Sequence, residues 1–291
     1  MTQSHQWTGA GRTETGHVRA SNQDALALLN DCGVWMVADG MGGHPAGDVA
    51  AYTAIAVATE RARERAAWLR EHSGAAAEFM ADLVTSANRQ IHELILAKPS
   101  LKGMGTTLVA LAMTSSPTSV AHIAHLGDSR AYLLRAGTLV QLTKDHSLLA
   151  RLTELDHPLL NDPSFGMPRN YLYRSLGQED EAPPDMMEFP IAPGDRLMIC
   201  SDGLWDELDD ATIQRCITST DDPAECANHL VRLANASGGH DNSTAVVVFV
   251  EAMRDDPATE FTPEQIDAIL RASGALDEEG EGEGEGESNG S

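Results

Sequence analysis

Two apolar stretches, far apart in the sequence, each end on an aspartate that is followed by glycine. The first is VWMVADG, ending at Asp39 and Gly40, and the second is RLMICSDG, ending at Asp202 and Gly203. A short apolar run bounded by turn residues is typical of a buried strand. Two such strands would bring both carboxylates to one end of a core. A glycine after the aspartate lets the backbone carbonyl approach a ligand closely.

Three more aspartates stand in similar polar settings beside predicted strands. Asp24 lies in RASNQDALALL, Asp128 in HLGDSRAYLL and Asp241 in SGGHDNSTAVVVFV. Each aspartate, taken singly, is explained as a turn or capping residue. As a set they would repel one another unless a cation lies between them. Oxygen ligands without cysteine or paired histidine donors select Mg²⁺, Mn²⁺ or Ca²⁺ rather than Zn²⁺. Two ions that share one carboxylate can lower the pKa of a water between them and provide hydroxide near neutral pH.

The elements that must position these side chains are short β-type runs and longer helical segments. Strands are expected at ALALLN, VWMVAD, TTLVALAM, SVAHIAHL, AYLLRAGTLVQL, RLMICS and TAVVVFV, and helices at Gly47–His72, Ala75–Ala97 and Pro223–Ala236. The strands mostly come in adjacent runs, which favours an α+β fold of antiparallel sheets with helices packed outside. His122 and His125 are three residues apart on one of these strands, so they should point to opposite faces and make a poor metal pair.

The charge and the apolar pattern exclude several classes of protein. The net charge is −24, of which −11 lies from Glu251 onward, and the remaining acidity argues against a nucleic-acid binder. No apolar run is long enough to cross a bilayer, and the first residues lack the hydrophobic stretch of a signal peptide. The four cysteines are scattered, without metal-site spacing. We therefore expect a cytoplasmic protein without membrane contact.

The chain divides into three parts. Residues 7–251 are expected to form one domain, with the first ten residues of the chain frayed. Residues 252–274 are expected to form a linker and a short amphipathic helix in EFTPEQIDAILRASG, which starts with a capping box and docks on its own domain or on a partner. Residues 275–291 are expected to be a disordered acidic tail, because the stretch DEEGEGEGEGESNGS within them cannot bury apolar surface.

Seven motifs in register resemble one family. They are TGHVRASNQDAL, VWMVADGMGGHPAGDVA, KGMGTTLVALAM, AHLGDSRAYLLRAGTLVQLTKDHSLL, YLYRSLG, DRLMICSDGLWDEL and GGHDNSTAVVV. Over roughly Thr13 to Val250 the chain resembles the bacterial branch of the metal-dependent serine/threonine protein phosphatases, the protein phosphatase 2C (PPM) family. The resemblance implies a central β-sandwich of two antiparallel sheets flanked by helices on both sides, in four αββα layers.

The resemblance also implies a centre of two Mn²⁺ or Mg²⁺ ions at one end of the sandwich. In it, Asp39 would bridge the ions and Gly40 would add its carbonyl. Asp202 and Asp241 match the other metal carboxylates of the family. Asp24 would coordinate directly or through water, and Asp128 resembles a ligand of a third, weaker ion.

Two further side chains match catalytic positions of the family. Arg19 corresponds to the arginine that binds phosphate, and a guanidinium can hold two phosphoryl oxygens at once. His44 is the expected proton donor to the leaving oxygen. Many eukaryotic members have histidine directly after Asp-Gly, where this chain has Met41, and the alternative for His44 is a capping or supporting residue. The segment from Asp145 to Gly177 matches the flap beside the cleft and departs most from the family pattern, so a third-ion ligand near Asn170 is left open.

These features predict a phosphatase that hydrolyses phosphoserine and phosphothreonine in proteins and opposes a bacterial serine/threonine kinase. Its partners would be phosphorylated proteins, including such a kinase or its substrates, and we expect a monomer. Two alternatives are a catalytically weak scaffold that binds phosphoproteins and a dedicated phosphatase of a sigma-factor regulator.

Overall fold

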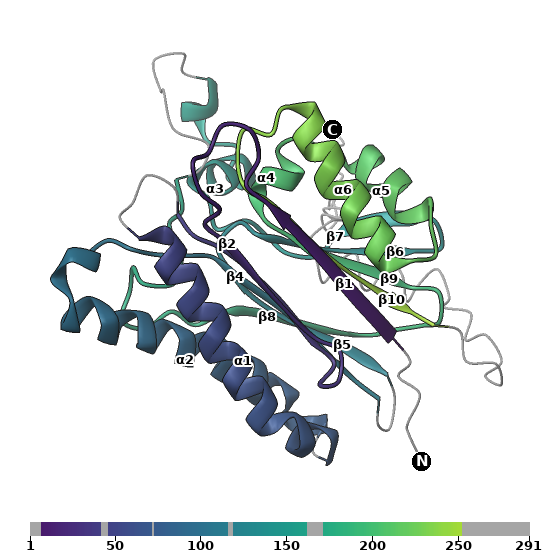
Figure 1. Ribbon diagram of the computed structural model, residues 1–291, viewed down its shortest axis with the longest axis horizontal. Coiled ribbons are helices and arrows are strands. Elements are labelled where there is room, and N and C mark those ends of the chain that lie inside the picture. Colours follow the sequence, from purple (N-terminus) through teal and green to yellow (C-terminus); the bar gives the residue numbers. More distant parts are fainter. Residues whose placement is uncertain (1–6, 42–45, 72, 116–118, 162–170, 252–291) are drawn as a thin grey trace, which may run out of the picture.

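The computed structural model describes residues 7–41, 46–71, 73–115, 119–161 and 171–251. In these ranges the strands form two antiparallel sheets of five strands each (Figure 1). The first sheet has the order β1 (Trp7–Glu14), β10 (Ser243–Val250), β9 (Arg196–Cys200), β6 (Arg130–Arg135) and β7 (Thr138–Gln141). The second has the order β2 (Asp24–Leu29), β3 (Val34–Asp39), β4 (Leu108–Thr114), β5 (Val120–Leu126) and β8 (Asp185–Pro190).

Helices cover the outer face of each sheet. The long helices α1 (Gly47–Glu71) and α2 (Ala76–Ala97) pack on the second sheet, and α5 (Asp210–Thr218) and α6 (Pro223–Ser237) lie over the first (Figure 1). Two short helices, α3 (Leu148–Glu154) and α4 (Asp202–Trp205), lie in the connections between strands, and 3₁₀ turns occur at Ser73–Ala75, Pro99–Leu101 and Pro158–Asn161. The predicted four-layer αββα sandwich is confirmed.

The core has three apolar layers because each sheet buries both of its faces. The central layer holds Trp35, Val37, Leu111, Ile199 and Val246, which are at most 1% exposed. The strands that contribute these residues are continuous apolar runs, as expected for strands covered on both sides. Outer layers lie between the second sheet and α1 and α2, and between the first sheet and α5 and α6.

Two strands were not predicted. The expectation that the first ten residues are frayed is wrong from Trp7 onward, because Trp7–Ala10 of β1 pair with Val250–Val247 of β10. The sequence of β1, WTGAGRTE, has no apolar run, which is why the strand was not predicted. Its Gly9 packs against the buried Trp35 indole, and a Cβ at this position would lie 2.1 Å from Trp35 Nε1. The other strand, β8, is a half-exposed sheet edge whose residues do not alternate clearly.

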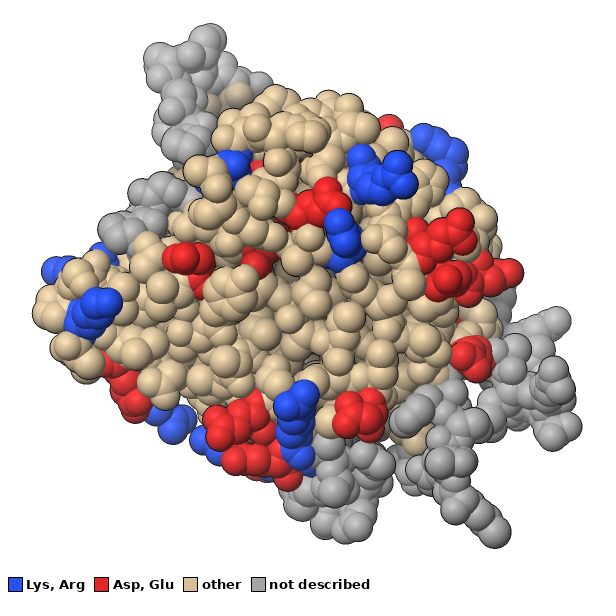
Figure 2. All heavy atoms as spheres, viewed as in Figure 1, with Lys and Arg blue, Asp and Glu red and all other residues tan. Residues whose placement is uncertain are grey.

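The remaining organisational predictions concern charge, membrane contact and the C-terminal residues. No helix in the described ranges is long and apolar enough to cross a membrane. On the face in Figure 2, basic side chains stand as separate groups between acidic ones. The predicted short helix in 252–274 and the acidic tail 275–291 lie outside the described residues.

Candidate metal centre

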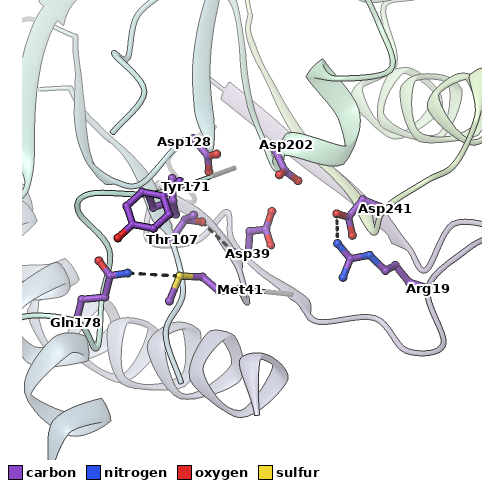
Figure 3. Close-up of a pocket in the computed structure, with 10 residues that line it drawn as sticks. Arg19, Asp39, Met41, Thr107, Asp128, Tyr171, Gln178, Asp202 and Asp241 are labelled. Carbon is purple, nitrogen blue, oxygen red and sulfur yellow. Dashed lines mark hydrogen bonds and ion pairs between the residues drawn. The ribbon is translucent and has the colours of Figure 1, made fainter. Parts of the chain in front are cut away.

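Carboxylates from both sheets converge on a cleft at one end of the sandwich. The cleft has a volume of about 240 Å³, and Figure 3 shows carboxylates from four separate segments directed toward its centre, with an arginine at its edge. The charged residues that line it are Arg19, Asp39, Asp128, Asp202 and Asp241. The structure therefore brings these five sequence-predicted residues together.

Asp39 is held by hydrogen bonds to its backbone. Its N–H donates to Thr107 Oγ1 at 3.0 Å, and its carbonyl accepts from Thr106 Oγ1 at 2.8 Å and from the Thr107 N–H at 2.9 Å. These bonds tie Asp39, the last residue of β3, to the segment just before β4, while its half-buried carboxylate faces the cleft (Figure 3). The next residue must be glycine, because a Cβ on Gly40 would lie 2.2 Å from the Gly47 carbonyl oxygen.

Asp24 lies opposite Asp39 in the β2–β3 pairing and is buried. Its Oδ2 accepts from Ser201 Oγ at 2.8 Å and from Thr244 Oγ1 at 2.6 Å; Thr244 belongs to β10 of the other sheet, and Ser201 directly follows β9 of that sheet. Its Oδ1 is buried and has no hydrogen-bond partner in the described ranges. A buried oxygen in this condition is suited to a cation or to a water that a cation binds.

Asp202 and Asp241 lie side by side because two loops pack closely. Asp202 is the first residue of α4 and is separated from the end of β9 by Ser201 alone. A Cβ on Gly203 would lie 2.1 Å from the Asn242 carbonyl oxygen. Asp241 accepts an ion-paired hydrogen bond from Arg19 at 2.5 Å (Figure 3). The arginine predicted to bind phosphate therefore contacts a predicted metal carboxylate.

Four carboxyl groups of the site, those of Asp24, Asp39, Asp128 and Asp202, have raised pKa values when no cation is present. Burial raises the pKa of Asp39 and of Asp128 well above the usual range, and the neighbouring carboxylates raise both further. Burial also raises the pKa of Asp202 to about 6, with Asp241 next in importance. The pKa of Asp24 is raised to about 7 by burial, against the opposing effect of its two hydroxyl donors. A divalent cation would take the place of these protons, and an oxygen-only donor set fits Mn²⁺ or Mg²⁺.

Asn242 is a supporting residue that the sequence analysis missed. Its Nδ2 donates to the carbonyl oxygens of Thr15 and Ser21, at 2.9 Å each, and its Oδ1 accepts from the Gln23 N–H at 2.8 Å. These three bonds hold the loop that carries Arg19 next to Asp241. The only signal in the sequence is the turn-forming Asp-Asn pair, which does not reveal a partner so far away in the chain.

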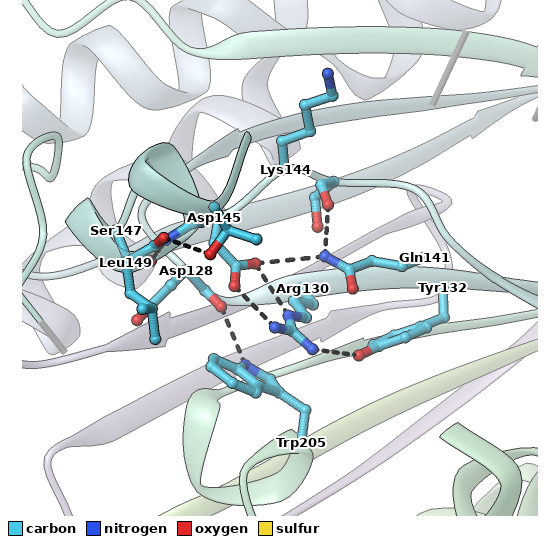
Figure 4. A network of polar contacts seen from close by, with 12 residues as sticks. Asp128, Arg130, Tyr132, Gln141, Lys144, Asp145, Ser147, Leu149 and Trp205 are labelled. Atoms are coloured by element: carbon cyan, nitrogen blue, oxygen red, sulfur yellow. Dashed lines mark hydrogen bonds and ion pairs between the residues drawn. The ribbon is translucent and has the colours of Figure 1, made fainter. Parts of the chain in front are cut away.

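The Asp128 turn lies between β5 and β6 and is also supported by residues that were not singled out. The Trp205 Nε1–H donates to the Asp128 carbonyl at 3.1 Å (Figure 4). Ser129 and Thr107 share a hydroxyl–hydroxyl bond of 2.6 Å, which links this turn to the end of β3. Arg130 stacks on the Trp205 ring, 3.6 Å from its centre, and forms two bonds with Asp145.

The wall of the cleft opposite Arg19 is largely uncharged. It is formed by Met41, Tyr171 and Gln178, and the Gln178 amide lies 3.9 Å from the Met41 sulfur (Figure 3). Leu172 also lines the cleft. His44, the predicted proton donor, and Asn170, near which a third-ion ligand was left open, lie outside the described residues.

The two strand histidines, expected to make a poor metal pair, form separate contacts. His122 bonds Thr114 Oγ1 at 3.1 Å, whereas His125 Nε2 donates to the Lys144 carbonyl at 2.9 Å. However, His125, His146 and Asp185 place one ligand atom each within 4.8 Å of one another, a grouping that the sequence analysis did not foresee.

An antiparallel αββα sandwich with a carboxylate-lined cleft and an arginine at its edge defines the class of metal-dependent phosphatases. The family model described as protein phosphatase 2C matches residues 13–236. The chain therefore belongs to the protein phosphatase 2C family and is a protein serine/threonine phosphatase.

Relatives with curated names and solved structures agree with this family. The chain is 34% identical over 240 residues to the serine/threonine phosphatase stp of Listeria welshimeri, a match that covers 81% of this chain and 93% of the relative. A crystal structure of the Mycobacterium tuberculosis phosphatase PstP has a TM-score of 0.73 and 34% identity, covering 84% of this chain and 99% of the other. The PstP catalytic domain in complex with two manganese ions has a TM-score of 0.72 and 33% identity, with the same coverage.

Proposed function

We propose that this phosphatase binds two Mn²⁺ or Mg²⁺ ions between Asp39, Asp202 and Asp241, and that Asp39 bridges them. The Gly40 carbonyl and Asp24 complete the ligand set, and Asp128 takes part in holding a third, weaker ion. The observation that carries the proposal is the convergence of carboxylates with raised pKa values at one end of the sandwich. The two manganese ions of the PstP relative support it.

Arg19 is proposed to hold the phosphate of the substrate. Its guanidinium is about one-third exposed at the edge of the cleft, where it can exchange its bond with Asp241 for two phosphoryl oxygens. The chemistry that bound Mn²⁺ or Mg²⁺ supplies is Lewis acidity, which activates water and offsets the charge on the phosphoryl group. Asn242 contributes by fixing the loop that carries Arg19.

His44 is proposed to donate the proton that the leaving serine or threonine oxygen requires. This assignment rests on the DGMGGH motif and on the suitability of imidazole near neutral pH. If it is correct, His44→Asn slows hydrolysis of a phosphothreonine peptide, whose leaving group needs the proton. The same variant should affect p-nitrophenyl phosphate much less, because nitrophenolate leaves without one. Equal losses on both substrates would indicate a supporting role instead.

The proposed setting is a cytoplasmic monomer that removes phosphate from proteins modified by a serine/threonine kinase, including the kinase itself. The names of the bacterial relatives support protein substrates. We propose that residues 7–251 contain the whole catalytic unit, so a chain truncated after Glu251 should keep its turnover.

The proposal is tested by Mn²⁺-dependent release of phosphate from a phosphothreonine peptide. We expect Asp39→Asn to abolish turnover and the matched variant Asp180→Asn to retain it, because the Asp180 side chain is fully exposed and lies outside the cleft. Absence of turnover in metal-loaded protein would contradict the proposal, as would an unchanged rate in Asp39→Asn. Peptide binding without turnover would favour the scaffold alternative.

A further inference from the structure

The grouping of His125, His146 and Asp185 has the spacing of a metal site, but its hydrogen bonds are those of a protein network. The Arg174 guanidinium already supplies a cation to Asp185, because its Nη1 donates to Asp185 Oδ1 at 2.7 Å. Nη1 also lies 2.9 Å from His146 Nε2, but a neutral imidazole accepts a hydrogen bond at one nitrogen only, and in this ring that nitrogen is Nδ1. His146 Nδ1 accepts the Gly127 N–H at 3.0 Å. A histidine that binds metal through Nε2 carries its proton on Nδ1 and donates it, which is the opposite of what Gly127 requires.

His146 instead forms two reciprocal hydrogen bonds with Gly127. Besides the Gly127 N–H bond to Nδ1, the His146 N–H donates to the Gly127 carbonyl at 3.0 Å. Burial lowers the pKa of His146 to about 4, with His125 and Arg174 adding to the effect, so the ring is neutral near pH 7 and Nδ1 is able to accept. Both backbone polar groups of Gly127 are thus bonded to one histidine, and Gly127 directly precedes Asp128.

The orientation of the His146 ring is set by its other neighbours. The ring is buried and stacks on His125 with a centre-to-centre distance of 4.7 Å and an interplanar angle of 15°. With Nδ1 accepting, the proton of the neutral ring is on Nε2, which faces Asp185 Oδ2 at 3.3 Å. Arg174 approaches the same carboxylate and donates to the Pro183 carbonyl.

These contacts connect the Asp128 turn to the segment 171–178, part of which lines the cleft. The Tyr173 N–H donates to the His146 carbonyl at 3.0 Å, and the Leu148 N–H donates to the Tyr171 carbonyl at 2.8 Å. Arg174 belongs to the same segment and donates to Asp185, the carboxylate that the His146 Nε2–H faces. The position of segment 171–178 and the position of Asp128 are therefore both tied to His146.

We propose that His146 is a positioning residue for the divalent ion at Asp128, and that its imidazole couples segment 171–178 to that carboxylate through Gly127. The proposal rests on the proposed role of Asp128 as an ion ligand. Two further contacts hold the same turn: Trp205 donates to the Asp128 carbonyl, and Ser129 is bonded to Thr107. A small rotation of the turn would move the carboxylate away from the ion.

Two substitutions separate the interactions of the ring. His146→Asn keeps an oxygen acceptor near the position of Nδ1 and loses the contact with Asp185, whereas His146→Leu loses both. We expect His146→Leu to raise the Mn²⁺ concentration for half-maximal phosphopeptide hydrolysis about tenfold, because a positioning bond of this kind contributes about 1–1.5 kcal/mol. The rate at saturating Mn²⁺ should largely recover, and His146→Asn should stay within about threefold of the wild type. His122→Leu, which removes another buried histidine that lies in β5 and has a different hydrogen bond, is the matched control.

A second measurement does not depend on activity. Because the Trp205 indole N–H donates to the Asp128 carbonyl, its ¹H–¹⁵N signal reports on this turn, and Trp205→Phe identifies that signal. In a Mg²⁺ titration we expect the midpoint of the Trp205 shift to move to higher Mg²⁺ in His146→Leu and to stay near that of the wild type in His146→Asn. Arg174→Met is the alternative if His146→Leu fails to fold, because the Arg174 side chain is partly exposed and its loss removes the ion pair with Asp185. This variant should also move the midpoint of the Trp205 shift to higher Mg²⁺.

The outcomes distinguish this inference from the proposed function. If Asp128→Asn raises the Mn²⁺ requirement but His146→Leu and Arg174→Met leave both midpoints within twofold of the wild type, the role of His146 is refuted and that of Asp128 stands. If Asp128→Asn has no effect, the assignment of Asp128 fails, and the positioning role fails with it. Equal effects of His146→Leu and His122→Leu would show a general loss of stability and would also overturn the inference.

Discussion

The buried carboxylates make the ion-free protein sensitive to alkali, and Asp24 provides the clearest case. Its pKa is raised from 3.8 to about 7, mainly by burial, so the folded state binds a proton that the unfolded chain releases above pH 4. The stability linked to that proton is fully present below about pH 4 and is lost as the pH rises through 7. Between pH 5 and pH 8 the contribution of Asp24 falls by about 3 kcal/mol. For a protein of this size, the melting temperature should drop by roughly 6–12 °C.

The assay is thermal unfolding followed by circular dichroism in a chelator, at pH 5 and pH 8, for the wild type and for Asp24→Asn. The amide of asparagine mimics the protonated acid. We therefore expect the difference in free energy of unfolding between pH 5 and pH 8 to be about 3 kcal/mol smaller in Asp24→Asn than in the wild type. The exposed control Asp180→Asn should retain all of it. Saturating Mg²⁺ should remove the loss at pH 8 in the wild type, because the ion stabilises the charged carboxylates. A wild type that is equally stable at both pH values without ions, or an Asp24→Asn variant that keeps the full dependence, would refute this reasoning.

Three further substitutions test the supports of the cleft. Asn242→Ala should raise KM for a phosphopeptide and lower the free energy of unfolding by about 1–3 kcal/mol, since three partly buried hydrogen bonds to the Arg19 loop are lost; steady-state kinetics and denaturant unfolding measure the two effects. Gly203→Ala should lower kcat/KM by about a hundredfold, because the added Cβ would lie 2.1 Å from the Asn242 carbonyl oxygen and must separate Asp202 from Asp241. A variant with the kcat/KM of the wild type would contradict this packing argument. Arg130→Lys should lower the free energy of unfolding, measured in urea, by about 1–3 kcal/mol, because lysine cannot replace the two bonds to Asp145 or stack as well on Trp205. An unchanged urea midpoint would contradict a supporting role for Arg130.

The sequence allowed the fold and the cleft residues to be predicted because their signals are local. The strands β3 and β9 are apolar runs that stop at Asp39 and just before Asp202, and such runs predict where each carboxylate lies. By contrast, β8 carries the sequence DMMEFP at a half-exposed edge, where neither alternation nor an apolar run is required.

The supports of the site could not be predicted because they depend on contacts between distant segments. Asn242 bonds to the carbonyl oxygens of Thr15 and Ser21, and any residue type could supply those acceptors. The same is true of His146, whose partner is the backbone N–H of Gly127. Sequence motifs identify the carboxylates that would bind ions. The hydrogen bonds that orient these carboxylates can be seen only in the tertiary structure.

The central claim, that Asp39 bridges two ions at the end of the sandwich, is tested most directly by a crystal of this protein soaked in Mn²⁺. The account predicts two strong manganese peaks in an anomalous difference map, with an Asp39 carboxylate oxygen between them and with Asp202 and Asp241 as further ligands. Manganese bound at His125, His146 and Asp185 with none among the aspartates, or two peaks that Asp39 does not touch, would contradict it.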